Sequence, residues 1–196
     1  MKYRIGILLG VTLFLAACQK ENKNDDNNTS QKPKVGTVWV YSYYTYYSSG
    51  GVATTKTVSY KAVSEESLGG EKWLKVNEMG VDTTVYYLRE KADGLYQYAN
   101  GTANLFCKEP AAGGQTYASF HRGGTENFTV ISAGITLPTN LGDIKVNYYE
   151  GSKNSLIADE IWYNTNAWIV KHQTYRKPPL GTNYKFSALF IQSITY

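Results

Sequence analysis

The chain has 196 residues, of which 42% are hydrophobic and 18% are charged, and this length suits one domain with a sizeable apolar core. Its 20 lysines and arginines and 16 aspartates and glutamates leave a formal net charge of +4, which gives no electrostatic footprint for nucleic acid. Two cysteines allow at most one disulfide, so the core has to form without a disulfide framework.

Residues 1–17 have the pattern of a secretory signal peptide. Lys2 and Arg4 precede an uncharged, mostly apolar run from Ile5 to Ala17. As a helix this run would be about 20 Å long, which is too short for a bilayer core of about 30 Å. A charged start, a short apolar core and small residues before a cleavage point predict a signal peptide instead of a membrane span.

The end of this run, Leu15-Ala16-Ala17-Cys18, resembles the lipobox of bacterial lipoproteins. The resemblance implies cleavage before Cys18, a thioether-linked diacylglycerol on its sulfur and a further acyl chain, such as palmitate, on its amine. Each buried methylene contributes about 0.8 kcal/mol, so two or more chains form a stable membrane anchor. The alternative is an ordinary signal peptide followed by a chance cysteine.

A polar segment, residues 18–36, follows and is rich in Lys, Asn, Asp, Gln, Ser and Thr. It has too little apolar surface to offset the entropy of ordering, so we expect a disordered tether. Its start, QKEN at 19–22, resembles the short lysine and acidic signals of some Gram-negative lipoproteins. That resemblance implies an outer-membrane lipoprotein displayed at the cell surface in preference to the periplasmic face. Loss of Lys2 and Arg4 lowers the basic count from 20 to 18 against 16 acids, so the mature chain is nearly neutral.

Residues 37–196 alternate apolar and polar side chains with a period of two, which predicts strands. Turn signals separate the segments at intervals near ten residues, and Asn100-Gly101 is the clearest tight hairpin. We therefore predict one all-β domain of about ten to twelve antiparallel strands, with no substantial helix after the signal peptide. A sandwich, a barrel and a lipocalin-like half-barrel all fit. The clearest segments are 37–47, 82–90, 126–132, 142–150, 159–165, 167–176 and 184–196.

Four segments of this body resemble, in the same order, a pattern in small uncharacterised all-β envelope lipoproteins of Gram-negative bacteria. They are GTVWVYSY (36–43), GLYQY (94–98), LPTNLGDIKVNYYE (137–150) and EIWYNTNAWIVKHQTY (160–175). The resemblance implies a curved antiparallel sheet, similar to lipocalin-like or lipoprotein-carrier half-barrels. Trp168 stands where those relatives often have glycine. The resemblance carries over no catalytic residues.

Residues suited to catalysis or metal binding are few. His121 and His172 lie far apart and outside any zinc-ligand spacing, so the pattern predicts no metal site and no cofactor. We expect His172 to be partly buried and hydrogen-bonded, His121 to lie at a solvated loop edge and Cys107 to be a small buried side chain. Asp159 and Glu160 are adjacent on a predicted strand and point to opposite faces, so they cannot flank one glycosidic bond. A carboxylate pair assembled across strands stays open.

Aromatic residues are the remaining signal, because 18 tyrosines and four tryptophans are many for this length. An apolar ring with a polar tip suits wet clefts and sugar-binding surfaces, although ordinary packing explains any single ring equally well. The candidate ligand-binding residues are Trp39, Tyr41, Tyr43, Trp162 and Trp168.

These patterns favour a lipoprotein held to the membrane by its N-terminal lipid. Its body would bind a small apolar or saccharide ligand, or an envelope protein, without catalysis. One alternative is a glycan- or lipid-directed hydrolase. Another is a structural or assembly component of an envelope complex.

Overall fold

The computed structural model describes residues 31–121 and 123–196, so the predicted signal peptide, Cys18 and most of the predicted tether lie outside the described residues. Within this part of the chain, no helix is long and apolar enough to cross a membrane. Its strands are β1 (Val38–Tyr46), β2 (Val52–Leu68), β3 (Glu71–Glu78), β4 (Thr83–Lys91), β5 (Gly94–Ala99), β6 (Thr102–Lys108), β7 (Thr116–His121), β8 (Gly124–Thr139), β9 (Gly142–Lys153), β10 (Leu156–Asn164), β11 (Trp168–Arg176) and β12 (Tyr184–Thr195).

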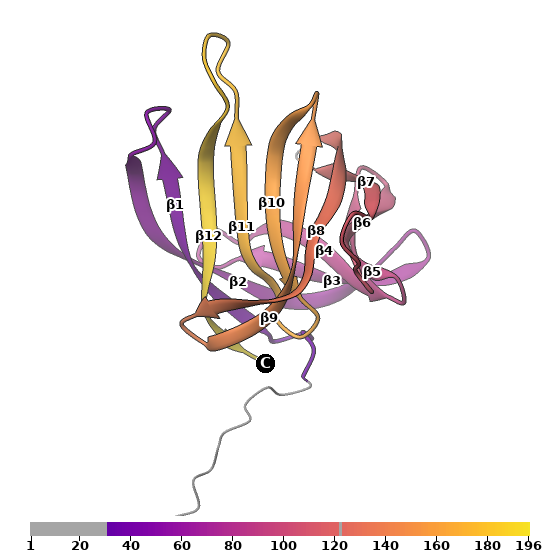
Figure 1. Ribbon diagram of the computed structural model, residues 1–196. Coiled ribbons are helices and arrows are strands. Elements are labelled where there is room, and N and C mark those ends of the chain that lie inside the picture. Colours follow the sequence, from indigo (N-terminus) through magenta and orange to yellow (C-terminus); the bar gives the residue numbers. More distant parts are fainter. Residues whose placement is uncertain (1–30, 122) are drawn as a thin grey trace, which may run out of the picture.

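These elements form one 12-stranded sheet in the order β6-β5-β4-β3-β2-β1-β12-β11-β10-β9-β8-β7. From β1 to β6 and from β7 to β12, each strand pairs antiparallel with its neighbours in the chain. β1 also pairs with β12, so the sheet curls into a nearly closed barrel with β6 and β7 as its edges (Figure 1). The expectation of an all-β antiparallel domain of ten to twelve strands is confirmed, and a barrel is selected over a sandwich.

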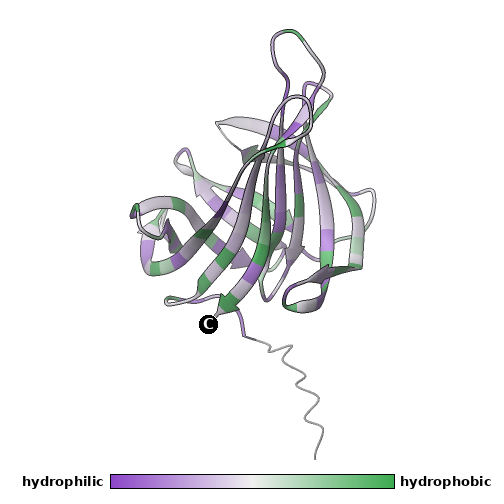
Figure 2. Ribbon diagram, turned by 90° about the vertical axis from the view of Figure 1, so that its left-hand side faces the viewer, coloured by the Kyte–Doolittle hydropathy of each residue, from purple (hydrophilic) through white to green (hydrophobic). Residues whose placement is uncertain are grey.

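Side chains alternate between the inside and the outside of the barrel along each strand. In β1, Trp39 and Tyr41 are buried inside, where they lie opposite Tyr60 and Val58 of β2. Figure 2 shows hydrophobic and hydrophilic residues following one another along the strands in this way. Cys107 belongs to the buried core, as predicted.

The gap between the edge strands β6 and β7, called the seam below, is bridged by tyrosine side chains. The hydroxyl of Tyr117 in β7 donates to the carbonyl of Phe106 in β6 at 3.0 Å. From β9, the hydroxyl of Tyr149 donates to the carbonyl of Lys108 at 2.5 Å. These bonds satisfy edge carbonyls that a closed barrel would pair through its backbone.

The two ends of the barrel carry different parts of the chain. Residues 31–37 join the barrel at the end where the C-terminus lies, and the N–H of Gly36 donates there to the carbonyl of Ala62 at 2.9 Å (Figure 1). The β1–β2, β9–β10 and β11–β12 turns lie at the opposite end. The N-terminal side of the domain therefore enters the barrel far from these three turns.

Candidate functional site

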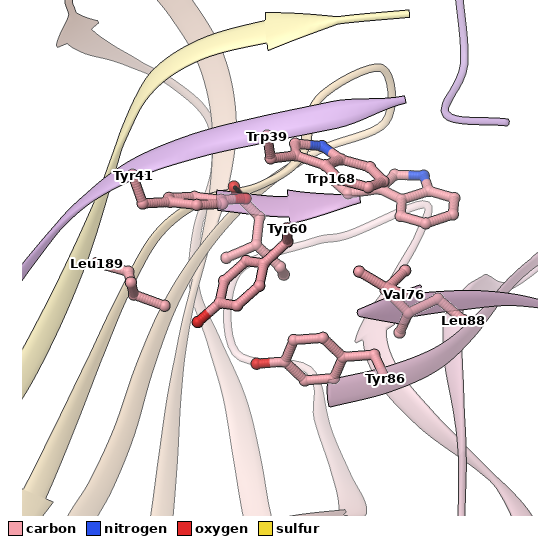
Figure 3. A pocket seen from close by; sticks show the side chains of 9 residues that line it. Trp39, Tyr41, Tyr60, Val76, Tyr86, Leu88, Trp168 and Leu189 are labelled. Atoms are coloured by element: carbon pink, nitrogen blue, oxygen red, sulfur yellow. Dashed lines mark hydrogen bonds between the residues drawn. The ribbon is translucent and has the colours of Figure 1, made fainter. Parts of the chain in front are cut away.

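An aromatic recess opens inside the barrel between β1–β4 and β11–β12. Its volume is about 30 Å³, which holds about two water molecules. Figure 3 shows the rings of Trp39 and Trp168 lying over each other, while the hydroxyl ends of Tyr60 and Tyr86 approach each other. The lining residues are Trp39, Tyr41, Tyr60, Val76, Tyr86, Leu88, Trp168, Ile169 and Leu189.

Two hydrogen bonds fix β1 against the start of β11 at this recess. The indole N–H of Trp39 donates to the carbonyl of Ala167 at 3.0 Å, and the hydroxyl of Tyr41 donates to the carbonyl of Ile169 at 2.7 Å. The rings of Trp39 and Trp168 stack with centroids 5.8 Å apart and planes 22° apart. Side chains from the first strand thus hold the β10–β11 turn, although β1 and β11 are not sheet neighbours.

Trp168 has an unusual backbone and an unpartnered donor. Its φ is 63°, in the left-handed region that favours glycine. The preceding turn is held by Asn164, whose side-chain oxygen accepts from the N–H groups of Asn166 and Ala167 at 2.8 and 2.9 Å. The Trp168 indole N–H is buried and has no hydrogen-bond partner among the described residues.

The structure brings together three of the five aromatic residues predicted from the sequence, namely Trp39, Tyr41 and Trp168. Tyr43 continues along the inner face of β1 beyond the recess, with the Lys56 ammonium 5.3 Å from its ring centroid. The fifth residue, Trp162, lies on the outer face of the sheet and is not part of the recess.

Contacts on the outer face explain the burial of Trp162. Its ring stacks on Tyr148 with centroids 4.6 Å apart and planes 7° apart, and the Lys171 ammonium lies 3.8 Å from its centroid. Burial lowers the pKa of Lys171, although the nearby Glu160 carboxylate opposes this effect. Trp162 therefore packs between strands, which is the ordinary structural role of a strand aromatic.

A second feature of the interior is a polar cluster formed by His121, Asp159 and His172. These residues come from β7, β10 and β11 and are only 5%, 0% and 8% exposed. Nε2 of His172 lies 2.7 Å from Oδ1 of Asp159, within hydrogen-bond distance, and Nδ1 of His121 lies 4.0 Å from Oδ2. The partly buried, hydrogen-bonded state expected for His172 is therefore what the structure shows.

The expectation that His121 lies at a solvated loop edge is wrong. Its ring lies 4.6 Å from Phe106 and 5.0 Å from Phe128, measured between centroids, so it is enclosed by apolar rings. The physical reason is that β7 extends as far as His121 and turns alternate side chains inward, including Ser119 and His121. Sequence alone did not show that these inward positions face Phe106 across the seam.

The electrostatics of the polar cluster favour a charged carboxylate. Burial by itself would raise the pKa of Asp159, but the hydrogen bond to His172 and the nearby imidazoles outweigh it, so the pKa lies below its ordinary value. Glu126 is buried as well, and its side chain adds to the lowering of the Asp159 pKa. Burial and the Asp159 charge together raise the pKa of Tyr86 to about 12, so this recess residue lies within electrostatic reach of the cluster.

Part of this polar cluster could be predicted from the sequence. In the β10–β11 hairpin, Asp159 pairs with Thr174 and Ile161 pairs with His172. Asp159 and His172 are thus diagonal neighbours on one face, and the hairpin register alone predicts their contact. His121 reaches them across the barrel interior, and no local pattern signals that approach.

Compared with known proteins, the chain matches no family model, no curated protein and no solved structure. Function is therefore inferred from the recess and the polar cluster themselves.

Proposed function

We propose that this chain is a lipid-anchored envelope lipoprotein whose barrel binds a small saccharide ring in the aromatic recess without catalysis. The observation that carries the proposal is Trp168, whose buried indole N–H lacks a partner at the wall of an aromatic recess. A buried unpaired donor costs about 1–3 kcal/mol, so a ligand oxygen that accepts from it would recover that cost.

The recess provides the two contacts that a sugar ring needs. Indole and tyrosine rings offer flat apolar surfaces. The Trp39 N–H and the Tyr41 hydroxyl already donate to backbone carbonyls, so the Trp168 N–H is the indole donor that a ligand can use. A space of about 30 Å³ is smaller than a sugar ring, so binding requires rim side chains such as Tyr60, Tyr86 or Leu189 to turn aside. A purely apolar ring would use the same surfaces and leave the Trp168 donor unpaired.

Anchorage follows from the lipobox at Leu15–Cys18. The acylated Cys18 would hold the chain in the outer membrane, preferably at the cell surface, and residues 19–36 would act as tether. Support comes from the entry of residues 31–37 at one end of the barrel (Figure 1). The β1–β2, β9–β10 and β11–β12 turns would then face away from the membrane.

Ligand binding is tested with a panel of mono- and disaccharides and apolar fluorescent probes, followed by tryptophan fluorescence and calorimetry. Trp168→Phe keeps an aromatic ring and removes the N–H, so we expect about tenfold weaker saccharide binding. Trp162→Phe makes the same change on the outer face and should leave affinity unchanged. Equal loss in both variants, or no saccharide binding by the wild type, would contradict the proposal. Binding of apolar probes alone would identify the ligand as apolar.

Localisation needs its own experiment. Protease treatment of intact cells should remove the barrel. Mass spectrometry of the N-terminal peptide should show the added mass of acyl chains on Cys18. A Cys18→Ala variant should lose both the acyl mass and membrane retention. Protection from protease with the acyl mass intact would place the barrel on the periplasmic side. A free thiol at Cys18 would overturn the anchor.

The position of the polar cluster argues against hydrolysis in the recess. His121, Asp159 and His172 are not among the residues that line it. Asp159 and Glu126 are both almost fully buried and neither lines the recess, so they present no carboxylate pair to a glycan there.

A further inference from the structure

Three ligand-forming side chains converge inside the barrel, two from the β10–β11 hairpin and one from β7. One nitrogen from each of His121 and His172 and one oxygen of Asp159 all lie within 4.8 Å of one another. Both imidazoles face the same carboxylate, because His172 lies 2.7 Å from one oxygen and His121 lies 4.0 Å from the other. The carboxylate is thus flanked by a nitrogen donor on each side.

These distances come close to those of a metal centre. Ligand atoms that each lie about 2.0–2.2 Å from a tetrahedral ion are about 3.5 Å from one another. The three ligand atoms, one from each residue, lie within 4.8 Å of one another, so even the most distant pair would have to approach by at most about 1.3 Å. Side-chain rotations of this size need no change in strand register.

The donor set selects a class of ion. Two imidazole nitrogens with one carboxylate oxygen suit first-row transition metals, whereas magnesium and calcium prefer oxygen ligands alone. Three protein ligands also leave a coordination position for water or for a further group. We propose that His121, Asp159 and His172 bind one divalent transition-metal ion inside the barrel.

The surroundings of the cluster provide the outer contacts that metal ligands need. Glu126 is buried within electrostatic reach of Asp159, and Phe106 and Phe128 pack against the His121 ring. A separate observation points to a further polar group at the site. Ser119, two residues before His121 on the same inner face of β7, has a buried hydroxyl without a hydrogen-bond partner among the described residues. A water on the ion would provide that partner.

This metal site does not depend on saccharide binding. None of the three ligands lines the recess, and Trp168 is not part of the cluster. Metal binding without saccharide binding, or the reverse, therefore separates the failure of one proposal from the failure of the other.

The first test uses the intact chain, purified without a histidine tag and stripped with a chelator. Titration with Co²⁺ should give d–d absorption bands that saturate at one ion per chain, and Zn²⁺ should displace the Co²⁺. X-ray absorption of the Zn²⁺ form should show scattering from two imidazole rings. A folded wild-type chain that retains no Co²⁺ or Zn²⁺, or binds them without imidazole scattering, overturns the proposal.

Adjacent residues on one strand supply matched variants. Asp159→Asn removes an inward ligand and should weaken Co²⁺ binding by about 100-fold. Glu160→Gln makes the same change on the outer face, where Glu160 accepts from Tyr148 and Tyr175, and should leave affinity within about twofold. If Asp159→Asn fails to fold, His172→Gln takes its place. The Co²⁺ spectrum of the wild-type chain tests the proposal without any variant. Equal affinities for the inward and outward variants overturn the proposal.

Discussion

Trp168 shows how one side chain can hold a backbone conformation that its own stereochemistry disfavours. A left-handed φ costs an L-residue about 1–2 kcal/mol, and Trp168 adopts one at 63°. Stacking on Trp39 and burial of all but 4% of its surface offset this cost. The ring is therefore retained for packing or for ligand contact, against the preference of the turn for glycine.

Replacement of Trp168 by alanine or glycine separates the two effects. Both variants lose the buried ring, at a cost of about 3–5 kcal/mol. Only alanine keeps the penalty of the positive φ, so we expect Trp168→Gly to be more stable than Trp168→Ala by about 1 kcal/mol in equilibrium urea unfolding. Trp162, inside β10, is the control, because alanine should be the more stable replacement there. If Trp168→Ala proved more stable than Trp168→Gly, the backbone at position 168 would carry no strain.

Gly151 provides space for the polar cluster and has no positive φ. A Cβ at this position would lie 2.6 Å from the Phe128 ring and 2.9 Å from Oε2 of Glu126. We expect Gly151→Ala to lower the free energy of unfolding by about 1–3 kcal/mol through overpacking. Gly51, where the nearest atom lies 3.9 Å away, is the control and should tolerate alanine within about 0.5 kcal/mol. Equal stability of the two variants, measured by urea unfolding, would contradict the tight fit.

At the scale of strands, the seam is the place where the barrel depends on side chains. β6 and β7 are the ends of the sheet, and each exposed edge is a potential site of pairing with another chain. The hydroxyls of Tyr117 and Tyr149 donate to two carbonyls of β6, those of Phe106 and Lys108. The seam should therefore open before the continuous part of the sheet does.

Removing these two hydroxyls tests the role of the seam. Tyr117→Phe and Tyr149→Phe each delete one hydrogen bond and should destabilise the fold by about 1 kcal/mol. In hydrogen exchange, the double variant should lose protection in β5–β7 first and keep it in β10–β12. Tyr44→Phe is the control, because that ring packs on Phe190 on the outer face. Uniform loss of protection across all strands would contradict a local opening.

Strands were predictable where segments rich in Val, Ile, Tyr and Trp stand between turn signals, as in β1, β9, β10 and β11. The candidate site was harder to predict from the sequence, because it depends on contacts between strands that do not pair. The β10–β11 register places Asp159 beside His172, but the approach of His121 follows from closure of the whole barrel. Likewise, Trp162 and Trp168 are both strand tryptophans in sequence, and only the structure shows that Trp168 lines the recess while Trp162 stacks on Tyr148 outside it.

At the scale of the whole molecule, many tyrosines are folded into places where they cannot ionise easily. Burial is the main cause that raises the pKa of each, and neighbouring tyrosines, Cys107 or carboxylates add to it. An unfolded tyrosine ionises near pH 10. The tyrosines with almost no exposed surface are Tyr41, Tyr149 and Tyr163, and burial also raises the pKa of the partly buried Tyr117.

Alkaline pH should therefore unfold the barrel cooperatively. Above about pH 10 the unfolded chain releases tyrosine protons that the folded chain keeps, so stability falls as pH rises, by about 1.4 kcal/mol per pH unit for each buried tyrosine. Below pH 10 both states are protonated and the effect vanishes. Tyrosinate absorbance should rise in two stages, and the second stage should coincide with loss of the β-sheet circular dichroism. Tyr117→Phe should make the pH dependence less steep, because one buried ionisable group is gone. If all the tyrosines of the barrel ionise while the β-sheet signal persists, the interior is open to solvent and the burial argument fails.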